Sequence, residues 1–96
     1  MVAYAIVQVE VTDPEKFQQY AAQVPEILKK YGGRYLARGG RLEVLNGQWP
    51  SKRLVVLEFP SIEAAKRWHD SPEYAGPRKL RDASARVNIA VVEGLA

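Results

Sequence analysis

The spacing of apolar residues in this chain alternates between the two-residue period of a strand and the 3.6-residue period of a helix. Residues Val2–Val11 alternate between two faces and are rich in β-branched side chains, as in a strand. Residues 17–31 carry one continuous apolar stripe at helical spacing. The same two periods continue to the end of the chain: they predict strands over 34–38, 41–45, 53–59 and 87–92, and helices over 61–70, from Ser71 to Gly76, and over 77–83.

Local signals predict where these elements begin, end or break. Asp13 before Pro14 is typical of a helix start, and Thr12 with Glu15, a capping box one residue earlier, is an equal alternative. Pro25 lies inside the apolar stripe, so we expect it to kink or split the first helix. The glycine pairs and turn signals complete the pattern: a helix end at Gly32-Gly33, a bulge or bend at Gly39-Gly40, a turn at Asn46-Gly47 and a helix break at Gly76-Pro77.

The order β-α-β-β-α-β predicts a ferredoxin-like α+β fold. With right-handed crossovers, this order gives a four-stranded antiparallel sheet with the helices on one face. The 96 residues suffice for one domain, so we expect a single domain over residues 1–96.

Composition narrows the protein class. The chain has no cysteine, which excludes disulfides and thiol chemistry and favours a cytoplasmic location. The apolar N-terminal stretch is short and has no basic leader, and no apolar run approaches the ~20 residues that cross a bilayer. We therefore expect no membrane association. The net charge of +3 permits acidic partners without requiring them.

One face of the predicted sheet is left without a cover. Assigning the most apolar set of each strand to the helices leaves the following residues on this open face: Tyr4, Ile6, Gln8, Leu36, Arg38, Leu54, Val56, Glu58, Asn88, Ala90 and Val92. A solvated sheet face is mostly polar, and this one is not. We expect a homodimer in which two such faces meet and form a two-sheet barrel. The alternative is a cover supplied by the loop after Leu45 or by the C-terminal tail.

Four segments resemble the domain-of-unknown-function 1330 family, in the right order and over almost the whole chain: Tyr31–Gly40, Glu58–Ser61, Trp68–Tyr74 and Val92–Gly94. The resemblance implies the dimeric α/β-barrel superfamily, which includes cofactor-independent monooxygenases, haem-degrading enzymes, muconolactone isomerases and purely binding members. The chain departs from the family pattern at His69, where tyrosine is common, and at Asn46-Gly47, where Glu-Gly is common.

Arg38 and Glu58 are charged residues within otherwise apolar strands. A hairpin centred near Gln48 places them opposite each other, where they form a cross-strand ion pair or a site. In the functional interpretation Arg38 binds a carboxylate or enolate of the ligand. Glu58 then either orients the Arg38 side chain or acts as a general base.

His69 is the only histidine and the third candidate catalytic residue. Its place beside Trp68 near a helix end also fits simple surface exposure. One histidine without cysteine argues against a transition-metal site, and we expect no metal or organic cofactor, although one histidine suffices to ligate haem.

The remaining candidates are ligand-binding residues, namely Tyr4, Gln8, Trp68, Tyr74 and Arg81. For Trp68 and Tyr74 core packing is an equally available interpretation. Arg81 belongs to a basic cluster, and such clusters ordinarily lie on a solvent-exposed face. To bind a ligand, its side chain would turn inward to the site.

Three functions compete at this point. The first is binding of, or cofactor-independent chemistry such as proton abstraction on, a small apolar or aromatic acid. The second is RNA binding, which the strand order permits, but the open face lacks a set of stacking aromatics and carries Glu58, so we expect no nucleic-acid partner. The third is a non-catalytic dimeric interaction or stress-related domain without a small ligand.

Overall fold

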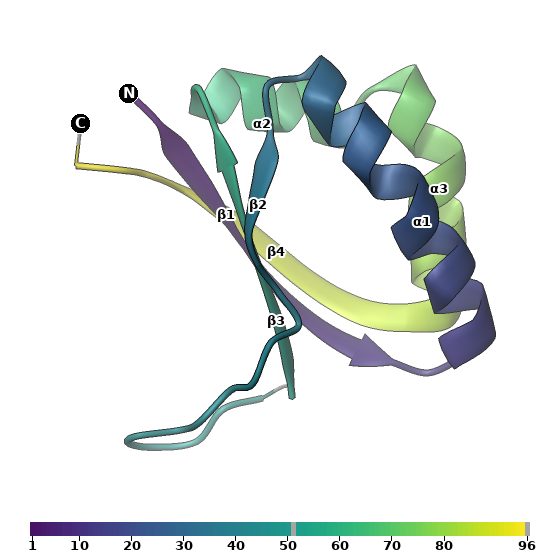
Figure 1. The fold of residues 1–96 in the computed structure, drawn as a ribbon, viewed down its shortest axis with the longest axis vertical. Coiled ribbons are helices and arrows are strands. Elements are labelled where there is room, and N and C mark those ends of the chain that lie inside the picture. Colours follow the sequence, from purple (N-terminus) through teal and green to yellow (C-terminus); the bar gives the residue numbers. More distant parts are fainter. Residues whose placement is uncertain (51, 96) are drawn as a thin grey trace.

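A computed structural model describes residues 1–50 and 52–95, so Ser51 and Ala96, which the predicted single domain includes, lie outside the described residues. The elements follow the predicted order, with two helices in the second crossover (Figure 1). Their bounds are β1 Ala3–Val11, α1 Pro14–Lys30, β2 Arg34–Arg38, β3 Arg53–Phe59, α2 Ile62–His69, α3 Pro72–Ser84 and β4 Ala85–Glu93.

The four strands form one antiparallel sheet in the order β2-β3-β1-β4. All three helices lie on the same side of this sheet (Figure 1). The architecture is the ferredoxin-like α+β fold that the sequence predicts. None of the helices in the described part of the chain is both long and apolar enough to cross a membrane.

Helix α1 begins and ends at its sequence signals. Asp13 is the N-cap, and its side chain accepts a hydrogen bond from the Lys16 backbone N–H. At the other end, the Gly33 N–H donates to the Leu28 carbonyl at 2.8 Å, and Gly32 takes the left-handed conformation with φ +76°.

Neither internal proline divides its helix. Pro25 lies inside a continuous α1, and α3 runs unbroken through Gly76 and Pro77 where the sequence predicts a break. Tyr74 and Pro77 are buried, and α3 packs along α1. Tertiary packing therefore outweighs the cost of about 3 kcal/mol of a proline within a helix.

Alternation correctly predicts the two faces of β1, β3 and β4. The helix-covered side of β1 and β3 holds buried Ala5, Val7, Val9, Leu57 and Phe59. On the opposite side, Tyr4, Ile6 and Gln8 stand beside Val92, Ala90 and Asn88 of β4. The open face therefore exists, with Leu54, Val56 and Glu58 contributed by β3.

The segment after β2 differs from the prediction. Residues 41–45 form no strand, and residues 39–50 extend beyond the end of the sheet as an irregular loop with Leu45 96% exposed (Figure 1). The segment that a strand over 41–45 would pair with contains Pro50, which has no backbone N–H to donate. Gly47 does adopt a turn conformation, with φ +76°.

A register shift between Tyr35 and Ala37 also corrects the face assigned to β2. Arg34 pairs with Glu58, but Ala37 pairs with Val56 and Arg38 with Val55. Arg38 therefore lies on the helix-covered side, and the predicted open-face position opposite Glu58 is wrong. Leu36 lies within the irregularity and is half exposed.

Gly33→Ala tests the close contact between the start of β2 and the core. A Cβ at Gly33 would lie 2.6 Å from the Phe59 ring, whereas a Cβ at Gly40 meets nothing within 4 Å. We expect Gly33→Ala to lower the free energy of unfolding by about 1–3 kcal/mol through overpacking. Urea denaturation measures this, with Gly40→Ala as the matched control. Equal stability of the two variants would contradict the packing.

Candidate ligand cavity

A small cavity lies between the sheet and helices α1 and α3. Its volume is about 40 Å³. Aliphatic side chains from the strands form its floor, and aromatic and basic side chains surround it. The lining residues are Val7, Val9, Phe17, Tyr20, Ala21, Val24, Tyr35, Arg38, Arg53, Val55, Leu57, Trp68, Tyr74, Arg81, Val87 and Ile89.

The charged side chains of the cavity all have the same sign. Arg38 comes from β2, Arg53 from the first residue of β3 and Arg81 from α3, and no Asp or Glu is among the described lining residues. Arg38 lies over the Tyr35 ring at 4.6 Å and Arg53 over the Phe17 ring at 5.3 Å. In such cation–π contacts the face of the ring attracts the guanidinium. Arg81 is also paired with Asp82, which lies outside the lining.

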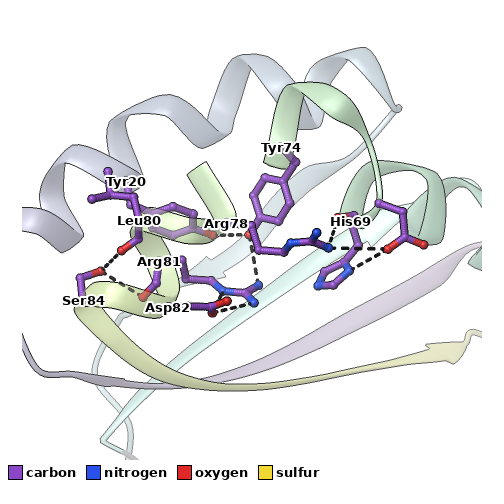
Figure 2. Close-up of polar contacts among 9 residues, drawn as sticks. Tyr20, His69, Tyr74, Arg78, Leu80, Arg81, Asp82 and Ser84 are labelled. Atoms are coloured by element: carbon purple, nitrogen blue, oxygen red, sulfur yellow. Dashed lines mark hydrogen bonds and ion pairs between the residues drawn. The ribbon is translucent and has the colours of Figure 1, made fainter. Parts of the chain in front are cut away.

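A hydrogen-bonded pair of phenols lies at the α1–α3 contact. The Tyr20 and Tyr74 hydroxyl oxygens are 2.6 Å apart, and Arg81 Nη1 donates to the Tyr74 oxygen at 3.4 Å (Figure 2). Arg81 is 9% exposed and also contacts the outward Asp82 carboxylate at 3.0 Å. This network fixes the direction of the Arg81 guanidinium.

Burial raises the pKa of the Tyr20 hydroxyl well above its ordinary value, and the proximity of Tyr74 adds to the shift. Burial likewise raises the pKa of Tyr35. Both phenols therefore keep their protons at neutral pH and can serve as hydrogen-bond donors. They are not suited to act as bases there.

Trp68 lines the cavity and carries a buried polar atom. Its side chain is 2% exposed, and its indole Nε1 is buried without a hydrogen-bond partner among the described residues. The ring packs on Phe59 and Tyr74 at centroid distances of 5.4 and 4.5 Å. A buried N–H without a partner costs about 1–3 kcal/mol, so an acceptor that reaches this atom gains that amount.

The structure thus brings together four of the eight candidate residues from the sequence, namely Arg38, Trp68, Tyr74 and Arg81. Tyr4, Gln8 and Glu58 lie on the opposite face of the sheet. Glu58 pairs there with Arg34, whose Nε is 2.9 Å from the carboxylate, so it does not orient Arg38. Asn88 Nδ2 donates weakly to Gln8 Oε1 at 3.5 Å.

His69 does not line the cavity. It ends α2, and its Nδ1 lies 3.3 Å from the Asp70 carboxylate, while Arg78 donates to its backbone carbonyl at 3.1 Å (Figure 2). Its ring borders a separate shallow hollow with Trp68, Ala65 and Ile89. The described residues contain no cluster of three or more His, Cys, Asp or Glu side chains that could hold a metal ion.

Sequence reasoning missed Arg53 and Tyr20 as site residues. The signal for Arg53 was available, because it extends the alternation of Val55, Leu57 and Phe59 on the helix-covered side by one step. Tyr20 lies on the apolar stripe of α1, a pattern that indicates core packing and not a site. Its hydroxyl partner is 54 residues away, and no local pattern indicates it.

The sheet order, the helices confined to one face and the internal cavity define a protein of the ferredoxin-like α+β class. More specifically, the chain belongs to the family described as domain of unknown function 1330 (DUF1330), whose model matches residues 2–95. No curated protein matches the sequence.

Solved structures share the fold at low sequence identity. The RPA0582 protein of unknown function from Rhodopseudomonas palustris has a TM-score of 0.81 at 17% identity, covering 99% of this chain and 83% of its own. A dimeric ferredoxin-like protein of unknown function from Jannaschia sp. CCS1 has a TM-score of 0.73 at 14% identity, covering 98% and 100%. SnoaB, a cofactor-independent oxygenase from Streptomyces nogalater, has a TM-score of 0.67 at 11% identity, covering 99% and 94%.

Raising the pH tests the burial of the phenol pair. Because the pKa of Tyr20 is higher in the folded chain, the unfolded chain loses this proton first, from about pH 10. The contribution of Tyr20 to the free energy of unfolding is therefore complete below that pH and declines as pH rises toward the folded-state pKa. We expect the free energy of unfolding to fall above about pH 10, and less steeply in Tyr20→Phe.

Urea denaturation across this pH range, on the wild type and on Tyr20→Phe, measures both slopes. Tyr20→Phe should also cost about 1 kcal/mol at neutral pH through the lost hydrogen bond. The difference in the free energy of unfolding between Tyr20→Phe and the wild type should then become smaller as pH rises. Parallel pH profiles for the two proteins would show that Tyr20 ionises equally in both states.

Proposed function

We propose that this protein binds a small aromatic acid in the cavity between the sheet and helices α1 and α3. The observation that carries the proposal is the lining itself. Three guanidinium groups from three elements surround an otherwise apolar and aromatic space, without a carboxylate among the described lining residues. Arginine suits planar carboxylates because its donors match both oxygens. Aliphatic and aromatic walls suit an apolar ring.

The donors in the cavity support anion binding more than proton abstraction. The described lining residues include cations and neutral phenols but neither histidine nor carboxylate. A general base must lie within hydrogen-bond reach of the proton that it removes. Glu58 and His69, which the sequence offers as bases, lie outside the cavity. A ligand-binding role is therefore favoured over catalysis by these two residues.

Titration with benzoate and with its neutral analogue benzyl alcohol tests this function. NMR spectra of ¹⁵N-labelled protein should show shifts at lining residues, with benzoate at least about tenfold tighter, the effect of a charged hydrogen bond. Arg53→Gln should reduce this preference. Arg67→Gln, an exposed arginine of α2 outside the cavity, is the matched control. Equal affinity for both compounds, or no binding, would instead favour the interaction-domain function.

We further propose that the open sheet face pairs with a second copy of the chain to form a two-sheet barrel. The face carries Ile6, Leu54 and Val56 at its centre and Val92, 55% exposed, toward one edge. Contiguous apolar surface of this kind is typical of interfaces. A two-fold axis lets the same face cover itself. The dimeric neighbour from Jannaschia sp. CCS1 supports this arrangement.

Val56→Lys tests the dimer, because it places a charge at the centre of the proposed interface, where no partner side chain compensates it. Light scattering after gel filtration should give twice the 10.8 kDa chain mass for the wild type and the single mass for the variant. Val92→Lys, at a more exposed position, should weaken the dimer less. Glu63→Lys on the exposed side of α2 is the control. A monomeric wild type would refute the interface.

A further inference from the structure

Pro25 leaves one carbonyl of α1 without its helical donor. In an α-helix the carbonyl of Ala21 accepts from the N–H of the residue four positions later, and that residue is Pro25, which has none. Arg38 of β2 takes this place, because its Nη2 donates to the Ala21 oxygen at 3.1 Å. A side chain from the sheet thus completes the hydrogen bonding of a helix on the other side of the cavity.

Arg38 stands at the rim of the cavity. It is the one exposed residue among the described lining residues, and its guanidinium spans from the Tyr35 ring to the Ala21 carbonyl. Tyr35 belongs to β2 and Ala21 to α1, so the side chain bridges two walls of the cavity. The other lining side chains are half-buried or buried within the packed body of the protein.

The cavity must widen before a ring can enter. About 40 Å³ accommodates a few water molecules at most. A dry protein cavity that takes benzene measures about 150 Å³. Among the lining side chains, Arg38 has the lowest free-energy cost of displacement. Its guanidinium can be solvated, and one hydrogen bond connects it to α1.

We propose that Arg38 is a latch that exchanges the Ala21 carbonyl for the carboxylate of the incoming ligand. The latch is the hydrogen bond from Arg38 Nη2 to Ala21 O, and it closes the cavity in the absence of ligand. When an aromatic acid arrives, its carboxylate replaces the carbonyl as the acceptor, and the ring enters the space that the side chain leaves. This inference rests on the proposed function and names the residue that selects acids over neutral analogues.

The exchange depends on Pro25. With a backbone N–H at position 25, the Ala21 carbonyl would be occupied within the helix, and Arg38 would lose its resting partner. Ligand binding would then no longer require a hydrogen bond to be broken. Pro25→Ala should therefore help carboxylate binding from a position that need not touch the ligand.

A double-mutant cycle over Pro25 and Arg38 tests the latch, with benzoate and benzyl alcohol as probes. We expect Pro25→Ala to tighten the binding of benzoate and of benzyl alcohol alike, about fivefold, the worth of one typical hydrogen bond, because either ring needs the latch open. Arg38→Ala should weaken benzoate at least about tenfold. In the Arg38→Ala background, Pro25→Ala should have no effect on benzoate. Arg67→Ala is the matched arginine control.

Urea denaturation of the same four proteins without ligand tests the resting bond independently. Arg38→Ala should destabilise the protein more when residue 25 is proline than when it is alanine, because only proline leaves the carbonyl dependent on Arg38. Additive effects on stability would overturn the latch even if benzoate binds. Binding of benzoate with an unchanged effect of Pro25→Ala in both backgrounds would overturn the exchange while leaving the proposed function intact. If the wild type binds neither probe, the proposed function fails and the exchange falls with it.

Discussion

The register shift between Tyr35 and Ala37 determines which side of the sheet each charge of β2 faces. Before the shift, Arg34 lies on the open face and pairs with Glu58. After it, Arg38 lies on the helix-covered side opposite Val55. One extra residue in a strand moves each side chain that follows it to the opposite face of the sheet. Without the shift, Arg38 would lie on the open face, and the cavity would lose one of its three cations.

Glycine 39 fixes the position of the next cation. It follows Arg38 directly, has φ +68°, and its N–H donates to the Leu54 carbonyl at 2.9 Å. A Cβ there would lie 2.5 Å from Arg53 Nη1. A side chain at this position would be strained and would also displace the Arg53 guanidinium. The backbone between β2 and the loop thus sets the position of two arginines at once.

The sequence predicts the features that depend on local periodicity and capping. The strand and helix order and the faces of β1, β3 and β4 follow from side-chain alternation. The cap signals place the start of α1 at Thr12 or Asp13, and the structure has Asp13. These properties depend on neighbours a few residues away, and so a single sequence is sufficient to indicate them.

The prediction fails where a distant contact decides the structure. Pro25 is tolerated within α1 because Arg38, thirteen positions later, donates to the Ala21 carbonyl the hydrogen bond that proline cannot. The Arg38–Glu58 pairing fails because the hairpin register places Arg34 opposite Glu58, and the bulge after Tyr35, which has no reliable signal in one strand alone, then moves Arg38 to the other face. The Tyr20–Tyr74 pair joins two helices that only the tertiary fold brings together. Half of the eight sequence candidates therefore line the cavity, and the contacts that orient them are not visible in the sequence.

The cavity and the open face are built from the same strands. Val55 lines the cavity while Val56, the next residue, lies on the open face, and the same relation holds for Val7 and Ile6. A strand buried on both faces has its backbone held more rigidly than one with a solvated face. Pairing of the open faces would therefore stiffen the floor of the cavity. The movement that admits a ligand would then fall to the opposite wall, where Arg38 meets α1.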